Sequence, residues 1–319
     1  MEYTMREGYF PSANQTDNIY YRALTPKDSP CGVVLVLHGM RSHSGQYHDF
    51  MHFLCENGFA VYAYDHAGHG RSVHEGGLYG SFAEKDGDVV LVKDLASMVE
   101  IIRKRFRHLP LFVFGHSLGS FVLRAYMASH KDTLDGAIIS GTCERIEVSY
   151  FKRKKLEKLV KKAGRAPSNA VGDMMIGVFE KQFPEAGGWI TTNPAAFAKR
   201  ADDPWTGHAM CADGYYDMFR LMQFISSDDW FKEVPKGVPL LLVSGERDPV
   251  GGMGKGVADV AEALDEAGVS DLTCRIFQGE KHEIIGSLSD AVAKEEILVW
   301  LKDKTEAAVA LRRTYLFGG

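Results

Sequence analysis

Short apolar runs recur along the chain and predict the strands of a buried sheet. Six runs are almost continuously apolar, and several are rich in β-branched residues. They occupy residues 33–37 (VVLVL), 60–64 (AVYAY), 111–114 (LFVF), 136–140 (GAIIS), 239–243 (PLLLV) and 272–277 (LTCRIF). Runs of this kind are typical of parallel strands that are buried on both faces.

Between these runs the apolar positions follow a helical period. One stripe has spacings of three and four residues and consists of Val92, Leu95, Val99, Ile102 and Phe106. Side chains spaced in this way share one face of a helix. Helices are also expected after Ser117 and over 256–267. Strands that alternate with helices predict an α/β sheet, and two weaker strand candidates, near 3–10 and 18–24, predict an antiparallel hairpin at its edge.

The alternation breaks between residues 142 and 235. This segment begins with the basic run FKRKKLEKLVKKAGR and later contains WITTNP, DDPWTGH and many aromatic residues, but no convincing buried strand. We therefore expect a helical cap (lid) over 142–235, inserted at one end of a core that comprises residues 1–141 and 236–319.

Composition and charge restrict the class of protein. The chain has 319 residues, of which 45% are hydrophobic and 25% charged, as in an ordinary globular protein. Its net charge of −5 argues against attraction to nucleic acid. No stretch approaches the roughly 20 apolar residues of a membrane span, and the N-terminal residues show no signal peptide. Five scattered cysteines without CxxC spacing predict reduced thiols in a cytoplasmic protein, and no zinc site.

The segment LFVFGHSLGSFVL at 111–123 carries the strongest chemical signal. Its Gly-x-Ser-x-Gly pattern, Gly115 to Gly119, follows a predicted strand and precedes a predicted helix. Such a turn holds the serine at a strained corner above the sheet edge, and glycines allow the close backbone approach. Ser117 is therefore the expected nucleophile, with a plain glycine-rich turn as the alternative.

A serine hydroxyl needs a base that accepts its proton. Enzymes built on such a turn carry their triad in the order serine, acid, histidine. His282 is the only histidine beyond residue 208, and it follows the last predicted strand. The strand before it is followed by Glu246 and Asp248. We predict Asp248 as the acid, because the Asp-Pro-Val turn directs a short side chain off the strand end.

Two backbone N–H groups should hold the oxyanion of the reaction. One is expected from Leu118, directly after the nucleophile, and the other from the loop after the strand at 33–37. In that loop, HGMRSHSGQY, Gly39 permits a close approach, so the N–H of Met40 is the candidate. His38 is expected to brace the loop.

These segments resemble a known family. The motifs are HGMRSHSGQY at 38–47, YDHAGHGRS at 64–72, FGHSLGS at 114–120, SGERDPVGGMGKGV at 244–257 and QGEKHEII at 278–285. In their order they are similar to the monoacylglycerol lipase and lysophospholipase branch of the α/β-hydrolases, which is grouped with serine aminopeptidase-type hydrolases. The resemblance implies the α/β-hydrolase fold, with a mostly parallel eight-stranded sheet flanked by helices and a helical cap.

The resemblance also implies site residues. Its triad positions fall on Ser117, Asp248 and His282, its oxyanion positions fall on Met40 and Leu118, and it needs no metal or organic cofactor. YDHAGHGRS is expected to be a structural turn in which His66 and His69 are not catalytic. The chain departs from the family pattern at Arg41 and Ser42, where relatives often carry Gly or Asn followed by Glu.

In this family the cap shapes an acyl pocket, and the composition of 142–235 suits one. Its candidate lining residues are Met174, Met175, Ile176, Val178, Phe179, Phe183, Trp189, Phe197, Trp205, Met210, Tyr215, Tyr216, Met218, Phe219, Leu221, Met222 and Phe224. Ordinary cap core is the alternative for each. The basic run over 152–165 suggests either a contact with a lipid surface or a solvated helix face.

We therefore expect a serine hydrolase that cleaves a single-acyl-chain ester, such as a monoacylglycerol or a lysophospholipid, without a nucleic-acid partner. A short-chain carboxylesterase and an aminoacyl-amide or peptide hydrolase with the same triad are alternatives. A non-catalytic ligand-binding module on the same scaffold is a further alternative, although binding alone needs neither the triad nor the turn.

Overall fold

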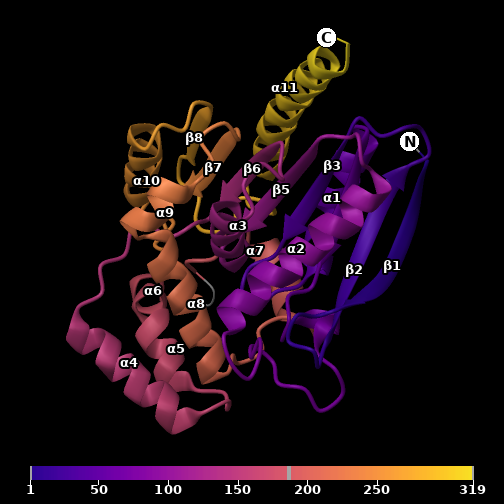
Figure 1. Ribbon diagram of the computed structural model, residues 1–319. Coiled ribbons are helices and arrows are strands. Elements are labelled where there is room, and N and C mark those ends of the chain that lie inside the picture. Colours follow the sequence, from indigo (N-terminus) through magenta and orange to yellow (C-terminus); the bar gives the residue numbers. More distant parts are fainter. Residues whose placement is uncertain (1, 185–187, 318–319) are drawn as a thin grey trace.

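A computed structural model describes residues 2–184 and 188–317, and its centre is an eight-stranded sheet (Figure 1). The strands are β1 (Tyr3–Pro11), β2 (Asn18–Pro26), β3 (Gly32–Leu37), β4 (Phe59–Tyr64), β5 (Leu111–His116), β6 (Gly136–Ser140), β7 (Leu240–Gly245) and β8 (Leu272–Phe277). Every apolar run in the sequence forms one of these strands. The expected edge hairpin is β1 with β2.

The strands lie in the order β1-β2-β4-β3-β5-β6-β7-β8. The β1–β2 and β2–β4 pairs are antiparallel, and all others are parallel. The prediction of a mostly parallel eight-stranded sheet is thus confirmed. Because β3, β5, β7 and β8 run in the same direction, the loops that follow them meet at one edge of the sheet.

Helices cover both faces of the sheet. They are α1 (His48–Glu56), α2 (Gly87–Arg105), α3 (Leu118–Ser129), α10 (Lys255–Glu266) and α11 (Asp290–Phe317), with short 3₁₀ turns η1 (Ser44–Tyr47) and η2 (Gly70–Ser72). A hydrophobic core lies on each face of the sheet, and successive residues of β3 point to one core and the other in turn. Val33, Leu35 and Leu37 face the core under α2, α3 and α10. Val34 and Val36 face the core under α1 and α11.

The segment between β6 and β7 is helical in the part of the chain that the structure describes. It contains α4 (Tyr150–Ala163), α5 (Asn169–Met175), α6 (Gly177–Gln182), α7 (Pro194–Ala201), α8 (Ala212–Ile225) and α9 (Asp228–Glu233). Helix α8 packs against α3 and joins this group to the sheet, and α4 lies far from the sheet (Figure 1). Within residues 2–184 and 188–317, no helix has the length and apolarity that crossing a membrane requires.

Candidate active site

Ser117 sits at a sharp turn between β5 and α3. Its backbone has φ 52° and ψ −119°, a combination that costs a non-glycine residue on the order of 1–3 kcal/mol. Hydrogen bonds hold the turn in place. The N–H of Ser117 donates to the carbonyl of Ser140 at 2.9 Å, and its carbonyl accepts from the N–H of Ser120 at 2.8 Å. The strained corner that the sequence predicts is therefore present.

The two glycines of the motif let three backbones come together. A Cβ on Gly115 would lie 2.6 Å from the carbonyl oxygen of Gly119. A Cβ on Gly119 would lie 2.5 Å from the carbonyl oxygen of Leu37, at the end of β3. Since real Cβ atoms do not approach backbone so closely, any side chain at either position would push α3 away from the sheet.

The structure brings His282 and Asp248 together at the carboxyl edge of the sheet. Nδ1 of His282 lies 3.0 Å from each carboxylate oxygen of Asp248, whose side chain is fully buried. The same carboxylate accepts from the N–H of Val250 at 2.9 Å, which fixes its direction. Glu246 points elsewhere, because its exposed carboxylate accepts from the N–H of Gly279 at 2.8 Å. With Nδ1 bound to Asp248, the Nε2 atom of His282 is the one left to exchange protons.

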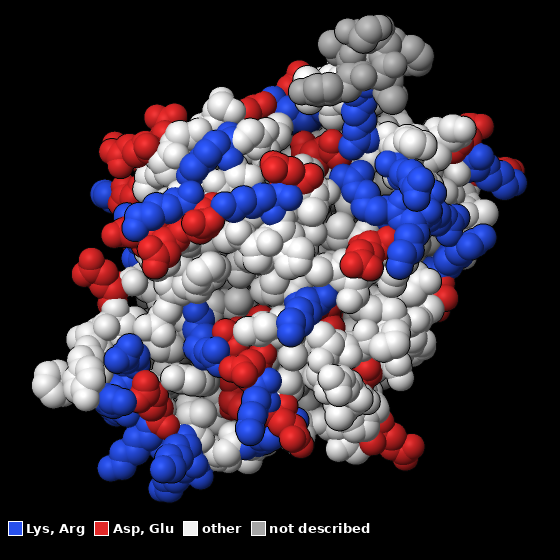
Figure 2. Space-filling model, in the orientation of Figure 1, with Lys and Arg blue, Asp and Glu red and all other residues white. Residues whose placement is uncertain are grey.

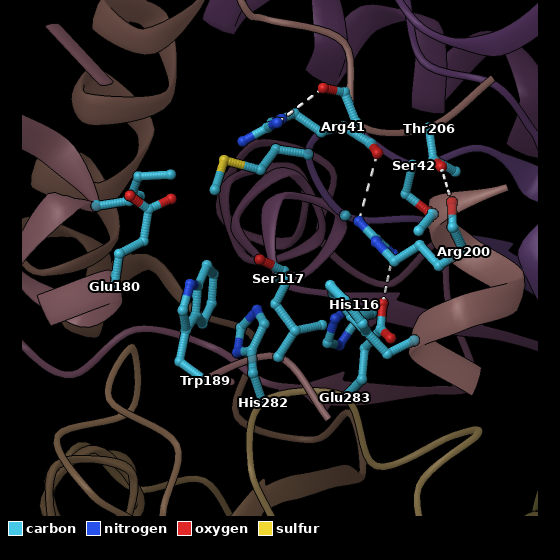
Figure 3. A pocket seen from close by; sticks show the side chains of 17 residues that line it. Arg41, Ser42, His116, Ser117, Glu180, Trp189, Arg200, Thr206, His282 and Glu283 are labelled. Carbon is cyan, nitrogen blue, oxygen red and sulfur yellow. Dashed lines mark hydrogen bonds and ion pairs between the residues drawn. The ribbon is translucent and has the colours of Figure 1, made fainter. Parts of the chain in front are cut away.

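Ser117 and His282 line the same cavity, which has a volume of about 290 Å³ (Figure 3). His116 lines this cavity too, with its ring centroid 4.7 Å from that of His282. Burial, and then the neighbouring His282, lower the pKa of His116 well below its usual value. His116 is therefore neutral at physiological pH and places no positive charge beside His282.

Met40 and Leu118 both adjoin the serine. Leu118 is the first residue of α3, where a backbone N–H has no partner within the helix. Met40 lines the cavity, and the preceding Gly39 is so close that a Cβ there would lie 3.0 Å from Cβ of Ser117. Leu118 and Gly39, the residue before Met40, thus both lie against Ser117.

Three buried histidines hold the loop that carries Met40. Nε2 of His38 accepts from the N–H of His66 at 2.9 Å, and Nε2 of His69 accepts from the N–H of Arg41 at 3.1 Å. Accepting at Nε2 requires both rings to be neutral. Burial agrees, since it lowers the pKa of His38 well below its usual value and that of His69 to about 4. His38 and YDHAGHGRS have the structural positions expected for them.

A strap of residues 189–193, between α6 and α7, runs along the loop that carries His282. The N–H of His282 donates to the carbonyl of Trp189 at 3.3 Å, and that of Glu283 donates to the carbonyl of Ile190 at 2.7 Å. The ring centroid of Trp189 lies 5.1 Å from that of His282. The sequence predicts Trp189 only as an acyl-pocket residue and carries no local signal of its contact with the histidine.

The cavity wall is more polar than the sequence suggests. Only Ile176, Trp189 and Phe197 of the predicted acyl-pocket residues line it, next to Arg41, Ser42, Glu180, Arg200, Thr206 and Glu283. The guanidinium of Arg200 pairs with Glu283 at 2.7 Å. Most of the other candidates are core or surface residues: Met210, Met218, Phe219 and Leu221 are buried, while Val178 and Phe224 are exposed. The buried ones pack the helices of this segment against one another, which is the alternative of ordinary core that the sequence leaves open for each candidate.

Comparisons with known proteins agree with the fold and the motifs. The family model of serine aminopeptidase, S33, matches residues 28–288. A monoacylglycerol lipase from Mycolicibacterium smegmatis is 24% identical over 284 residues, which are 89% of this chain and 92% of that protein. The monoglyceride lipase of Mus musculus is 29% identical over 121 residues, 38% of either chain.

Among solved structures, a thermostable carboxyl esterase from Bacillus coagulans, in complex with glycerol, superposes with a TM-score of 0.88. It is 28% identical, and the superposition covers 95% of this chain and 99% of that one. The family match spans both the Ser117 turn and the His282 loop. The chain therefore belongs to the serine aminopeptidase S33 family of α/β-hydrolases, within its monoacylglycerol lipase-like branch.

Proposed function

We propose that the protein hydrolyses carboxylic esters through an acyl-enzyme formed on Ser117. The observation that carries this proposal is the placement of His282, which is bound to both oxygens of Asp248 through Nδ1 and shares a cavity with the strained Ser117. A binding module would need neither the buried carboxylate nor the strained serine.

In the proposed reaction the Ser117 hydroxyl attacks the ester carbonyl while His282 takes its proton. Asp248 orients the imidazole and stabilises the imidazolium that forms. The N–H groups of Met40 and Leu118 hold the oxyanion. The alcohol then leaves with the proton from His282, and water hydrolyses the acyl-enzyme in a second round of the same steps.

The relatives support an ester of one acyl chain, since those named above are monoacylglycerol lipases and a carboxyl esterase. We propose that residues 142–235 act as the cap of a core made of 1–141 and 236–319. The cap supplies one wall of the cavity through Ile176, Trp189 and Phe197. A monoacylglycerol or lysophospholipid is the substrate that we propose first.

The size of the cavity favours a second candidate, a short-chain carboxylesterase. About 290 Å³ is at the lower end of the roughly 300–1,000 Å³ that small-molecule sites occupy. Several polar side chains also line the cavity, as described above. A long acyl chain would require the cap to move outward.

Acyl glycerols with chains of two to twelve carbons (a test range, about ten methylenes) separate the two candidates. Each buried methylene contributes about 0.8 kcal/mol, so kcat/KM should rise up to roughly fourfold per carbon until the pocket is full. A rise that continues to twelve carbons supports the lipase, and a plateau at about four supports the short-chain esterase. Ser117→Ala should fold normally and lose activity by about 10⁶-fold. Near-normal activity in this variant, or turnover of aminoacyl amides instead of esters, would refute the proposal.

We also propose a cytoplasmic protein that meets its substrate at a lipid surface through α4. Phe151, at the start of this helix, is 81% exposed, and Tyr150 is 60% exposed. The lysines that follow are charged and exposed, and Lys154 pairs with Glu157 at 2.8 Å. The nearby Arg165 forms ion pairs with Glu84 and Asp213. Exposed aromatic rings next to lysines suit the boundary between headgroups and acyl chains.

A further inference from the structure

Arg41 and Ser42 follow Met40 directly, and the proposed reaction does not use their side chains. They are also the two positions where the oxyanion loop departs from the family pattern. The structure places both in the wall of the cavity that contains Ser117 and His282 (Figure 3). Because neighbouring Cα atoms are about 3.8 Å apart, their side chains start within a few atoms of the proposed oxyanion donor.

The guanidinium of Arg41 lacks a carboxylate partner among the residues that the structure describes. Its Nη2 donates to the carbonyl of Gly207 at 2.7 Å, which fixes the side chain against the cap. Its Nε is buried and has no acceptor in the described parts of the chain. Arg41 therefore offers a positioned positive charge with an unused donor.

Ser42 adds a second unused donor. Its side chain is 2% exposed, and within residues 2–184 and 188–317 its Oγ has no hydrogen-bond partner. A buried hydroxyl without a partner destabilises the protein that carries it. This cost is recovered when a substrate oxygen accepts the hydrogen bond, so the position is suited to a ligand with acceptor oxygens.

Near the loop that carries Met40, the positive charge of Arg41 is the one without a carboxylate partner among the described residues that line the cavity. Arg200 donates to the carbonyl of Arg41 at 3.3 Å, but its charge is balanced by Glu283 at 2.7 Å. The remaining carboxylate of the wall, on Glu180, is exposed and belongs to α6. Figure 3 shows the Arg41 side chain extending toward the side of the cavity where Glu180 lies, with no ion pair drawn between the two residues.

We propose that Arg41 and Ser42 form a subsite for an anionic oxygen group that the substrate carries a few atoms from its ester carbonyl. A phosphate and a carboxylate share this chemistry. Arginine suits both, because its planar fork matches their paired oxygens. The inference rests on the proposed ester hydrolysis and narrows its substrate class to acidic esters.

Three butyryl esters that differ only in the alcohol test the subsite: those of glycerol, glycerate and glycerol 3-phosphate. The wild-type enzyme should prefer one or both acidic esters over the neutral one, and the preference should weaken with added salt. A comparison of kcat/KM for the glycerate ester with that for the glycerol 3-phosphate ester distinguishes a carboxylate site from a phosphate site. A wild-type enzyme that prefers the neutral ester overturns the subsite, whereas one that hydrolyses none of the esters overturns the proposed function.

Arg41→Gln should lower the ratio of kcat/KM for the acidic ester to that for the neutral ester by about tenfold or more, mainly through KM. Arg41→Lys should restore part of the ratio, and Ser42→Ala should lower it by a smaller factor. Arg275→Gln, which removes an exposed arginine at the β8 edge, should leave the ratio at its wild-type value. If Arg41→Gln slows all three esters equally, Arg41 only supports the loop and the subsite is refuted.

Because Arg41 also holds the cap, a second test uses anions that are not themselves hydrolysed and includes a readout of binding, the melting temperature, that does not depend on turnover. Glycerol 3-phosphate or inorganic phosphate should inhibit hydrolysis of the neutral ester competitively and raise the melting temperature of the wild-type protein. Both effects should be lost in Arg41→Gln and kept in Arg275→Gln. Equal inhibition of these two variants would contradict the proposal.

Discussion

At the scale of single residues, the direction of a side chain decides which group can act. Glu246 and Asp248 follow β7 two positions apart, yet only Asp248 reaches His282. Its short side chain leaves the Asp-Pro-Val turn inward, and the N–H of Val250 keeps it there. The longer Glu246 lies outside and caps the backbone of Gly279. The Asp-Pro-Val turn is readable from the sequence, and it favours Asp248 over Glu246 as the side chain that is directed toward His282.

Exchange of these two acids for their amides tests the proposed role of Asp248. Asp248→Asn keeps the shape but removes the charge that stabilises the imidazolium, so kcat should fall by roughly 10⁴-fold. Glu246→Gln is the matched control and should change kcat by less than about twofold, because an exposed capping bond contributes little. Both are measured on one soluble ester. A severe loss in Glu246→Gln together with a mild one in Asp248→Asn would reverse the assignment.

At the scale of the elements, the sheet was predictable and the interior of the cap was not. A strand such as β3 is buried on both faces, so its apolar run identifies it without knowledge of its neighbours. For the aromatic residues of the cap, the sequence does not indicate which of them line the cavity and which pack between helices. Trp189 lines the cavity whereas Phe219 packs in the core, although both are large aromatic residues of the same predicted helical segment. Contacts such as Arg200 with Glu283 join segments 83 residues apart, which no local pattern reveals.

The strap over the His282 loop predicts that the cap positions the proposed base. Trp189→Ala removes the ring beside the imidazole, and a base that is misplaced by about 1 Å costs up to 10²-fold in rate. We therefore expect kcat on a short ester to fall more than KM changes, with partial rescue in Trp189→Phe. Phe224→Ala, at an exposed cap position, should retain the wild-type kcat. A change in KM alone would show that Trp189 only lines the substrate site.

The contact of α8 with the start of α2 predicts a pH dependence of stability. Burial, followed by the neighbouring Asp88, raises the pKa of Asp217 to about 7. In the unfolded chain this pKa is about 3.9, so between the two values the folded state binds the extra proton. The contribution of Asp217 to stability therefore falls as the pH rises from about 4 to about 7, and it levels off above that.

Asp217→Asn should remove this dependence. The measured quantity is the unfolding free energy of the variant minus that of the wild type. This difference should increase with pH, by up to about 1.4 kcal/mol per pH unit between pH 5 and 7 (a range set by the two pKa values), and then stay constant. Urea unfolding at several pH values measures it. Asp229→Asn, at an exposed position on α9, is the control and should show a difference that does not vary with pH. A gain for Asp217→Asn that is equally independent of pH would contradict the assignment.

At the scale of the whole molecule, two basic areas lie on one face (Figure 2). One covers α4 in the cap, and its lysines accompany the exposed rings of Tyr150 and Phe151. The other lies at the end of α2 and includes Lys104 and Arg105. Both attract anions, but only the first combines charge with large exposed apolar side chains. An anionic lipid surface should therefore bind the area on α4 more strongly than the area at the end of α2.

Vesicles that contain anionic lipid and a long-chain acyl glycerol test this difference. Replacing Lys154, Lys155, Lys158 and Lys162 of α4 by Gln should lower activity on the vesicles, because each cation near such a surface contributes about 1 kcal/mol. Added salt should lower wild-type activity on the vesicles in the same way, since charges are screened over about 8–10 Å. Hydrolysis of a short soluble ester should not change in either case. Replacing Lys104, Arg105 and Arg107 of the second area by Gln is the control, with three charges removed instead of four, and should leave vesicle activity intact. Equal losses from both areas would mean that net charge, and not α4, brings the protein to the lipid.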